Sequence, residues 1–238
     1  MDDDTTVNNS QFKKLIVEQA VIQRLIAYII GLFIASLGVA FARSSGLGIS
    51  PMNVLPYVLS IIFENVTFGT LSAAQLWLFI LIQIVLLRRD FKWIQLGQFI
   101  FAMIFGYFVD LSVWMLGDFT IPTYAGQLVM MTIGIVCISS GLTIYVNTFL
   151  MPLPTEGIVL AISHVTKGAF HRVMIATQSS IALITLIISL LFLGGVYGVR
   201  EGTILFSIFV GKLVPYLSKV IVPALKKFGI HMAGSLRK

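Results

Sequence analysis

The chain has 238 residues, of which 58% are hydrophobic and only 11% are charged, and its mean hydropathy is +0.98. This composition leaves too few polar residues to cover a soluble globular protein. The formal net charge of +6 falls mainly in short loops and at the C-terminal end, where membrane orientation explains it better than nucleic-acid binding. The sequence therefore predicts an all-α polytopic membrane protein that contacts the lipid bilayer.

Residues 1–23 are polar and begin with an acidic run, without a basic n-region or a small-residue cleavage site. We expect a cytoplasmic tail with an interfacial helix from Ser10 to about Gln23, and not a signal peptide. Six apolar windows follow, and each is long enough to cross a hydrocarbon core of about 30 Å as a helix. Their apolar runs are continuous and not alternating, which favours helices over barrel strands. The windows are residues 24–41, 71–87, 96–116, 128–145, 173–193 and 204–222.

Two stretches that are poor material for a spanning helix interrupt these windows, "LGISPMN" at residues 47–53 and "MPLPTEG" at residues 151–157. A short apolar segment follows each one; the first, about 14 residues long, would give only about 21 Å of helix. Because proline is tolerated in the first turn of a helix, we expect both short helices to begin at a proline. The break residues are Gly46, Gly48, Pro51, Pro152 and Pro154.

The two breaks belong to an internal repeat. Shifting the sequence against itself by 103 residues, and by 105 residues further on, aligns its glycine, proline and glutamine landmarks. We therefore expect two membrane repeats, residues 24–118 and 124–223, followed by a basic cytoplasmic tail at residues 224–238. The aligned pairs include Gly31 and Gly134, Gly38 and Gly141, Pro51 and Pro154, Gln75 and Gln178, and Gly106 and Gly211.

The basic residues indicate how the repeats cross the membrane. If the short helices are re-entrant, "RRDFK" (residues 88–92), "KGAFHR" (residues 167–172) and both termini lie on the cytoplasmic side, as the positive-inside rule requires. The repeats are then inverted, with three spanning helices and one half-helix each. The alternative is a parallel 4+4 arrangement in which the short helices span and the basic loop at residues 88–92 lies outside.

In the inverted arrangement, the N-termini of both half-helices meet near the middle of the membrane. Their free N–H groups and helix dipoles favour an anionic or carboxylate-bearing solute there. The alternative is that glycine and proline only allow kinks and close packing, that Gln75 and Gln178 hydrogen-bond neighbouring helices, and that Arg43 is an ordinary interfacial residue. The candidate substrate-binding residues are Ser50, Asn53, Thr155, Gly157, Gln75, Gln178 and Arg43.

Three charged residues fall within the apolar part of the sequence, and they are candidate coupling groups because intramembrane charges are costly. Glu156 lies in the first turn of the second short helix, where it could instead cap free N–H groups. Asp110 lies in the window at residues 96–116, and Lys212 lies in the last window, residues 204–222. They could instead form a buried ion pair, or the lysine could extend toward the membrane surface.

Motifs for other chemistry are missing. The three histidines show no ligand spacing, the single cysteine excludes an intrachain disulfide, and no Walker or Rossmann motif occurs. We therefore expect no metal, no cofactor and no enzymatic activity.

The pattern "GLFIASLGVAF", followed by "GLGISPMNVL" and "FGTLSAAQL", with a second copy in "PLPTEGIVLAISHV", resembles the bacterial YczE/YyaS/YitT group of integral membrane proteins. The resemblance covers about residues 24–222, and its most specific element is the start of the first short helix at Leu47, Gly48, Ser50 and Pro51. It implies a duplicated helical fold and a bacterial plasma membrane location, and it implies no substrate.

These features together predict a small secondary transporter for an anionic or zwitterionic solute, with H⁺ or Na⁺ as coupling ion. One alternative is a channel of the same fold. The other is a non-transporting membrane partner that regulates another complex through its basic tails. A homo-oligomer is compatible with each of the three.

Overall fold

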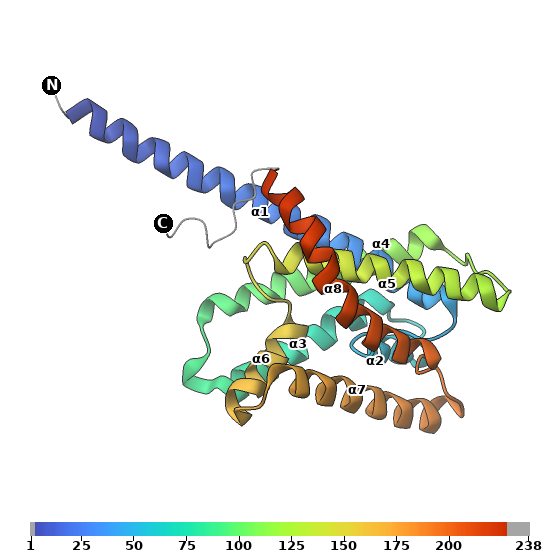
Figure 1. Ribbon diagram of the computed structural model, residues 1–238. Helices are drawn as coiled ribbons and strands as arrows, with labels where there is room; N and C mark the ends of the chain where they lie inside the picture. The colour runs from blue at the N-terminus through green and yellow to red at the C-terminus, as the bar shows by residue number, and fades with distance from the viewer. Residues whose placement is uncertain (1–2, 228–238) are drawn as a thin grey trace.

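The computed structural model describes residues 3–227, with side chains for residues 21–225. Its α-helices are six long ones and two short ones, and no strand occurs within the described residues (Figure 1). The long helices are α1 (Asp3–Ser45), α3 (Phe68–Leu87), α4 (Gln98–Leu116), α5 (Tyr124–Val146), α7 (Phe170–Leu193) and α8 (Glu201–Lys227). The short helices are α2 (Val54–Ile62) and α6 (Pro154–Thr166), and two 3₁₀ turns, Arg88–Asp90 and Trp93–Gly97, connect α3 to α4.

Six helices are long and apolar enough to cross a membrane, and each contains one of the six apolar windows of the sequence. The prediction of an all-α, multi-pass membrane protein is therefore confirmed. The candidate spans are Val21–Ser45, Phe68–Asp90, Trp93–Leu116, Tyr124–Val146, Phe170–Leu193 and Glu201–Leu225.

The two ends of the chain differ from the expected boundaries. The helix expected to begin at Ser10 is not a separate interfacial element, because α1 continues without a break from Asp3 to Ser45. At the other end, α8 extends to Lys227. The rest of the expected basic tail, residues 228–238, lies outside the described residues.

Helices α1 and α5 form the centre of the molecule, where four glycines let them approach closely. A Cβ atom on Gly31 would lie 3.0 Å from the carbonyl oxygen of Gly141, and one on Gly38 would lie 2.7 Å from that of Gly134. Because residue numbers rise along one helix as they fall along the other, the two helices cross in antiparallel directions. Small residues are the usual means of close helix packing within a bilayer.

The short helices each pack against the other half of the chain as well as their own. Helix α2 contacts α3 and α7, whereas α6 contacts α7 and α3. The expectation that a helix begins at a proline is correct for Pro154, which is the first residue of α6. It is wrong for Pro51, because residues 51–53 form a turn and α2 begins only at Val54.

The first break is buried against the loop that precedes α8. The amide of Ile49 donates to the carbonyl oxygen of Gly198 (3.0 Å), and the amide of Gly202 donates to that of Leu47 (2.9 Å). Gly48 has a φ of +115°, and a Cβ there would lie 2.8 Å from the Thr203 hydroxyl. This position therefore requires glycine for both its conformation and its surroundings.

The last two helices of each half are arranged differently. Helix α3 packs along α4, with Gly69 against Gly106. Helices α7 and α8 do not pack along one another over their described residues, and they diverge from the loop that joins them (Figure 1). In the aligned repeat, Gly106 corresponds to Gly211, which has no atom within 4 Å of an added Cβ, and Gly69 corresponds to Arg172. The close glycine contact between α3 and α4 therefore has no counterpart between α7 and α8.

Candidate functional site

A cavity of about 110 Å³ lies between the beginnings of α2 and α6. We call it the central cavity. Its volume is large enough for several water molecules, and apolar side chains make up most of its wall. Residues from both breaks line it, together with residues of α1, α3, α4, α5, α7 and α8. The polar residues of its wall are Ser50, Asn53, Tyr145, Thr155, Glu156 and Gln178.

Among the described residues, Glu156 is the one charged residue in the wall of this cavity. The hydroxyl of Tyr145 donates a hydrogen bond to Glu156 Oε1 over 2.9 Å. Glu156 Oε2 is buried and has no hydrogen-bond partner among the described residues, and no described lysine or arginine forms an ion pair with it. A buried carboxylate oxygen without a partner is costly to keep ionised, so proton binding or a cationic group would stabilise it.

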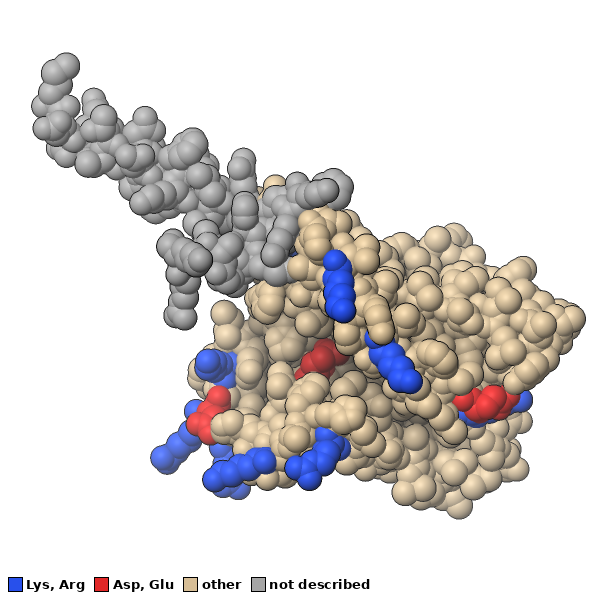
Figure 2. Space-filling view, in the orientation of Figure 1, with Lys and Arg blue, Asp and Glu red and all other residues tan. Residues whose placement is uncertain are grey.

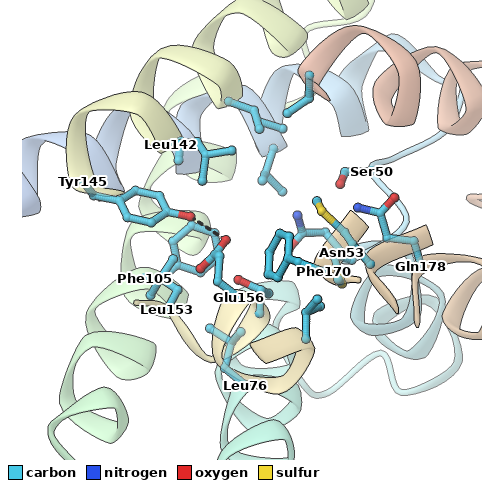
Figure 3. Close-up of a pocket in the computed structure, with 18 residues that line it drawn as sticks. Ser50, Asn53, Leu76, Phe105, Leu142, Tyr145, Leu153, Glu156, Phe170 and Gln178 are labelled. Atoms are coloured by element: carbon cyan, nitrogen blue, oxygen red, sulfur yellow. Dashed lines mark hydrogen bonds between the residues drawn. The ribbon is translucent and has the colours of Figure 1, made fainter. Parts of the chain in front are cut away.

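The polar residues occupy two sides of the central cavity. Figure 3 shows Glu156 and Tyr145 on one side, Ser50, Asn53 and Gln178 on the other, and the ring of Phe170 between them in this view. Asn53 is the N-cap residue of α2, but its side chain makes no capping hydrogen bond. The N-terminus of α6 likewise has no side-chain cap. Both helix ends therefore contribute positive backbone potential near the cavity.

Five of the sequence-predicted site residues thus line one cavity, namely Ser50, Asn53, Thr155, Glu156 and Gln178. The other predicted residues lie elsewhere. Arg43 is half-buried in the last turn of α1 and does not line the cavity. Gly157 packs against the side chain of Gln83, whose Oε1 atom would lie 2.5 Å from an added Cβ.

The two glutamines that align in the repeat have different environments. Gln75 is buried, and its Nε2 donates to the carbonyl oxygen of Met52 over 2.6 Å, so it holds the first break against α3. Gln178 is half-buried and lines the central cavity. Gln83 was not among the candidates, although its Nε2 lies 3.4 Å from the carbonyl oxygen of Pro154 at the start of α6. A polar amide side chain within the apolar window at residues 71–87 was the sequence feature that could have indicated a role for Gln83.

Asp110 stabilises the start of α3. Its carboxylate accepts hydrogen bonds from the hydroxyl of Thr67 (2.6 Å) and from the amide of Gly69 (2.6 Å). This is a helix-capping arrangement at the edge of the α3–α4 contact. The ion pair with Lys212 considered from the sequence is not formed, and Lys212 is exposed on α8.

We expect Asp110→Ala to lower stability by about 1–2 kcal/mol, because it removes two charge-assisted hydrogen bonds at a helix N-terminus. The measurement is the melting temperature of the purified protein in detergent. Asp118→Ala is the matched control, since Asp118 is an exposed aspartate in the loop that follows α4. Equal melting temperatures for the two variants would contradict the capping role.

The described part of the chain, with six candidate spans and a mostly apolar cavity between two short helices, defines a multi-pass helical membrane protein. Residues 22–219 match a family described as "Family of unknown function (DUF6198)", and the chain belongs to this family. The chain is 27% identical over 202 residues to the "Uncharacterized membrane protein YczE" of Bacillus subtilis (strain 168). The aligned residues cover 84% of this chain and 87% of that protein. The resemblance to YczE-like membrane proteins is thereby confirmed. No solved structure matches the chain.

Proposed function

We propose that the protein is a secondary transporter that carries a small zwitterionic or anionic solute through the central cavity, coupled to the protonation of Glu156. The observation that carries this proposal is the unpartnered Oε2 atom of Glu156 at a cavity between the starts of two short helices. Transporters commonly place their solute sites at discontinuous helices of this kind.

An inverted duplication is part of the proposal. Under the repeat alignment, Gly31 corresponds to Gly134 and Gly38 to Gly141, yet Gly31 packs against Gly141 and Gly38 against Gly134. Helices α2 and α6 are likewise exchanged in their contacts with α7 and α3. Such reciprocal, antiparallel contacts are expected when a two-fold axis in the membrane plane relates the two halves. They support the 3+3 arrangement over parallel repeats.

The lining of the central cavity favours a zwitterion over a simple anion. No lysine, arginine or histidine is among its described lining residues, so a carboxylate group would rely on Asn53, Ser50 and the N-terminus of α2. A protonated amino group at the other end would face Glu156. An anion without an amino group would leave the carboxylate of Glu156 unneutralised unless a proton accompanies it.

The test uses the purified protein in liposomes that contain a pH-sensitive dye, with alanine and lactate as paired probes. Lactate replaces the amino group of alanine by a hydroxyl group. We expect alanine to acidify the lumen faster than lactate, and we expect Glu156→Gln to lower the alanine-driven rate by about tenfold or more, because this substitution removes the proton-binding atom. Glu64→Gln, in an exposed turn after α2, is the control and keeps the wild-type rate.

Three outcomes would overturn parts of the proposal. If Glu156→Gln and the wild type acidify the liposome lumen at the same rate, Glu156 is not the coupling group. Radiolabelled alanine uptake that ignores the proton gradient would indicate a channel. Absence of both alanine and lactate uptake, with no change of melting temperature on adding either probe, would remove the proposed substrate class.

A further inference from the structure

The opening between α7 and α8 forms a second and larger recess, which we call the α7–α8 groove. Its volume is about 840 Å³, and its wall comes from α7, from α8, from the loop before α8 and from Pro51 of the first break. A connecting recess of about 300 Å³ shares Ser50 and Gln178 with the central cavity. Figure 2 shows a hollow on this face of the molecule, with basic side chains along its upper edge. No aspartate or glutamate is among the described residues that line the groove. The polar groove residues are His171, Gln178, Ser179, Arg200, Thr203, Ser207 and Lys212.

Polar and apolar residues line the groove together, and the surrounding helix faces are apolar. Leu183, Ile187 and Leu191 of α7 and Ile204 of α8 are between 49% and 75% exposed. In a bilayer these exposed side chains would contact acyl chains. A lipid molecule could therefore reach the groove from the side while its acyl chains remain among apolar residues.

The net charge of the groove is positive. Arg200 donates to the carbonyl oxygen of Gly46 over 2.9 Å and lies 3.4 Å from Glu201, so its charge is already compensated. Lys212 lies near the middle of the span Glu201–Leu225 and forms no ion pair with a described residue. An uncompensated lysine at this depth is costly in hydrocarbon, and an anionic group beside it would remove most of that cost.

We propose that the α7–α8 groove binds an acidic phospholipid, whose anionic headgroup is approached by the Lys212 ammonium group as its side chain extends toward the membrane surface, and whose acyl chains stay in the bilayer beside α7 and α8. His171 at the start of α7, together with the hydroxyls of Ser179 and Ser207, offers further hydrogen-bonding groups to a headgroup phosphate. This inference does not require the proposed transport function, although the groove shares Gln178 with the wall of the central cavity.

The test is native mass spectrometry of the full chain in detergent, titrated with dioleoylphosphatidylglycerol or with dioleoylphosphatidylcholine. We expect preferential binding of the acidic lipid at one saturable site. Lys212→Gln should weaken that binding about fivefold, which corresponds to about 1 kcal/mol. This is the usual contribution of one basic residue to the binding of an anionic lipid. Lys219→Gln is the matched control, because Lys219 is also exposed on α8 but lies over the ring of Tyr216, outside the groove.

Gly211→Phe tests the site without a change of charge. Gly211 lines the groove, and an added Cβ atom there meets no atom within 4 Å, so a phenylalanine ring at this position would extend into the groove. We expect this variant to lose most of its preference for the acidic lipid. Equal losses for Lys212→Gln and Lys219→Gln, equal binding of both lipids by the wild type, or unchanged binding by Gly211→Phe would each overturn the proposal. A wild-type dimer that Gly211→Phe converts to a monomer would also overturn it, since a second copy would then occupy the groove.

Discussion

Replacing Gly141 by leucine is expected to destabilise the protein by more than about 3 kcal/mol, at the upper end of the usual cost of overpacking. A Cβ atom at this position would lie 2.5 Å from the amide nitrogen of Ala35 and 2.5 Å from the carbonyl oxygen of Gly31. These are backbone atoms of α1, which cannot move aside as a flexible side chain would. The two central helices would have to separate, and their contact holds the two halves of the chain together.

The measurement is the yield of monodisperse protein together with the melting temperature, followed through the fluorescence of the three tryptophans. Gly38→Leu should behave like Gly141→Leu, because an added Cβ there meets the backbone of Gly134 and Ile138 at 2.7 Å. Gly211→Leu is the control, as no atom lies within 4 Å of that position. A Gly141→Leu protein that melts like Gly211→Leu would show that the glycine contact is dispensable.

The second prediction with a large expected effect concerns the orientation of α3 in the membrane. Each end of α3 is expected to be either fully accessible or fully protected from labelling outside the cell. In a Cys137→Ser background, we expect Asn65→Cys to react with an impermeant maleimide in intact bacterial cells, and Asp90→Cys to react only after permeabilisation. Asn65 and Asp90 are exposed at opposite ends of the span Phe68–Asp90. The basic residues next to Asp90 favour the cytoplasmic side. The lone cysteine must be replaced because its own labelling would obscure the result.

The reverse pattern, with Asp90→Cys labelled and Asn65→Cys protected, would support the four-span alternative. Helix α2 would then cross the membrane, although its nine residues give only about 14 Å of helix. Equal labelling of both positions in intact cells would mean that α3 does not separate the two sides of the membrane. Only the first pattern agrees with re-entrant short helices.

The sequence was sufficient to locate the spans and both breaks. A spanning helix needs a minimum length of apolar residues, and that requirement can be checked along the chain without knowledge of neighbours. Glycine and proline likewise interrupt a helix for local reasons. The placement of Ser50, Asn53, Thr155 and Glu156 around one cavity follows from these local features combined with the repeat.

Lateral contacts could not be predicted in the same way. Helices such as α3 and α5 are apolar around their whole circumference, so no face indicates which neighbour they meet. For this reason, the sequence did not reveal that Gln75 reaches the backbone of Met52 while its aligned partner Gln178 lines the cavity. The α7–α8 groove could not be predicted either, because the importance of Gly69 becomes clear only once its contact with Gly106 is known.

The hydrogen bonds between the first break and the loop before α8 restrict how α8 can move. Ile49 binds Gly198, and Gly202 binds Leu47, so the beginning of α8 is joined to the segment that leads into α2. If α8 changes its tilt to narrow the groove, it must pivot at this end, and the far end must travel the greater distance. The same rotation would apply a torque to the residues just before Asn53, so lipid occupancy at the side of the molecule and the width of the central cavity would be mechanically linked.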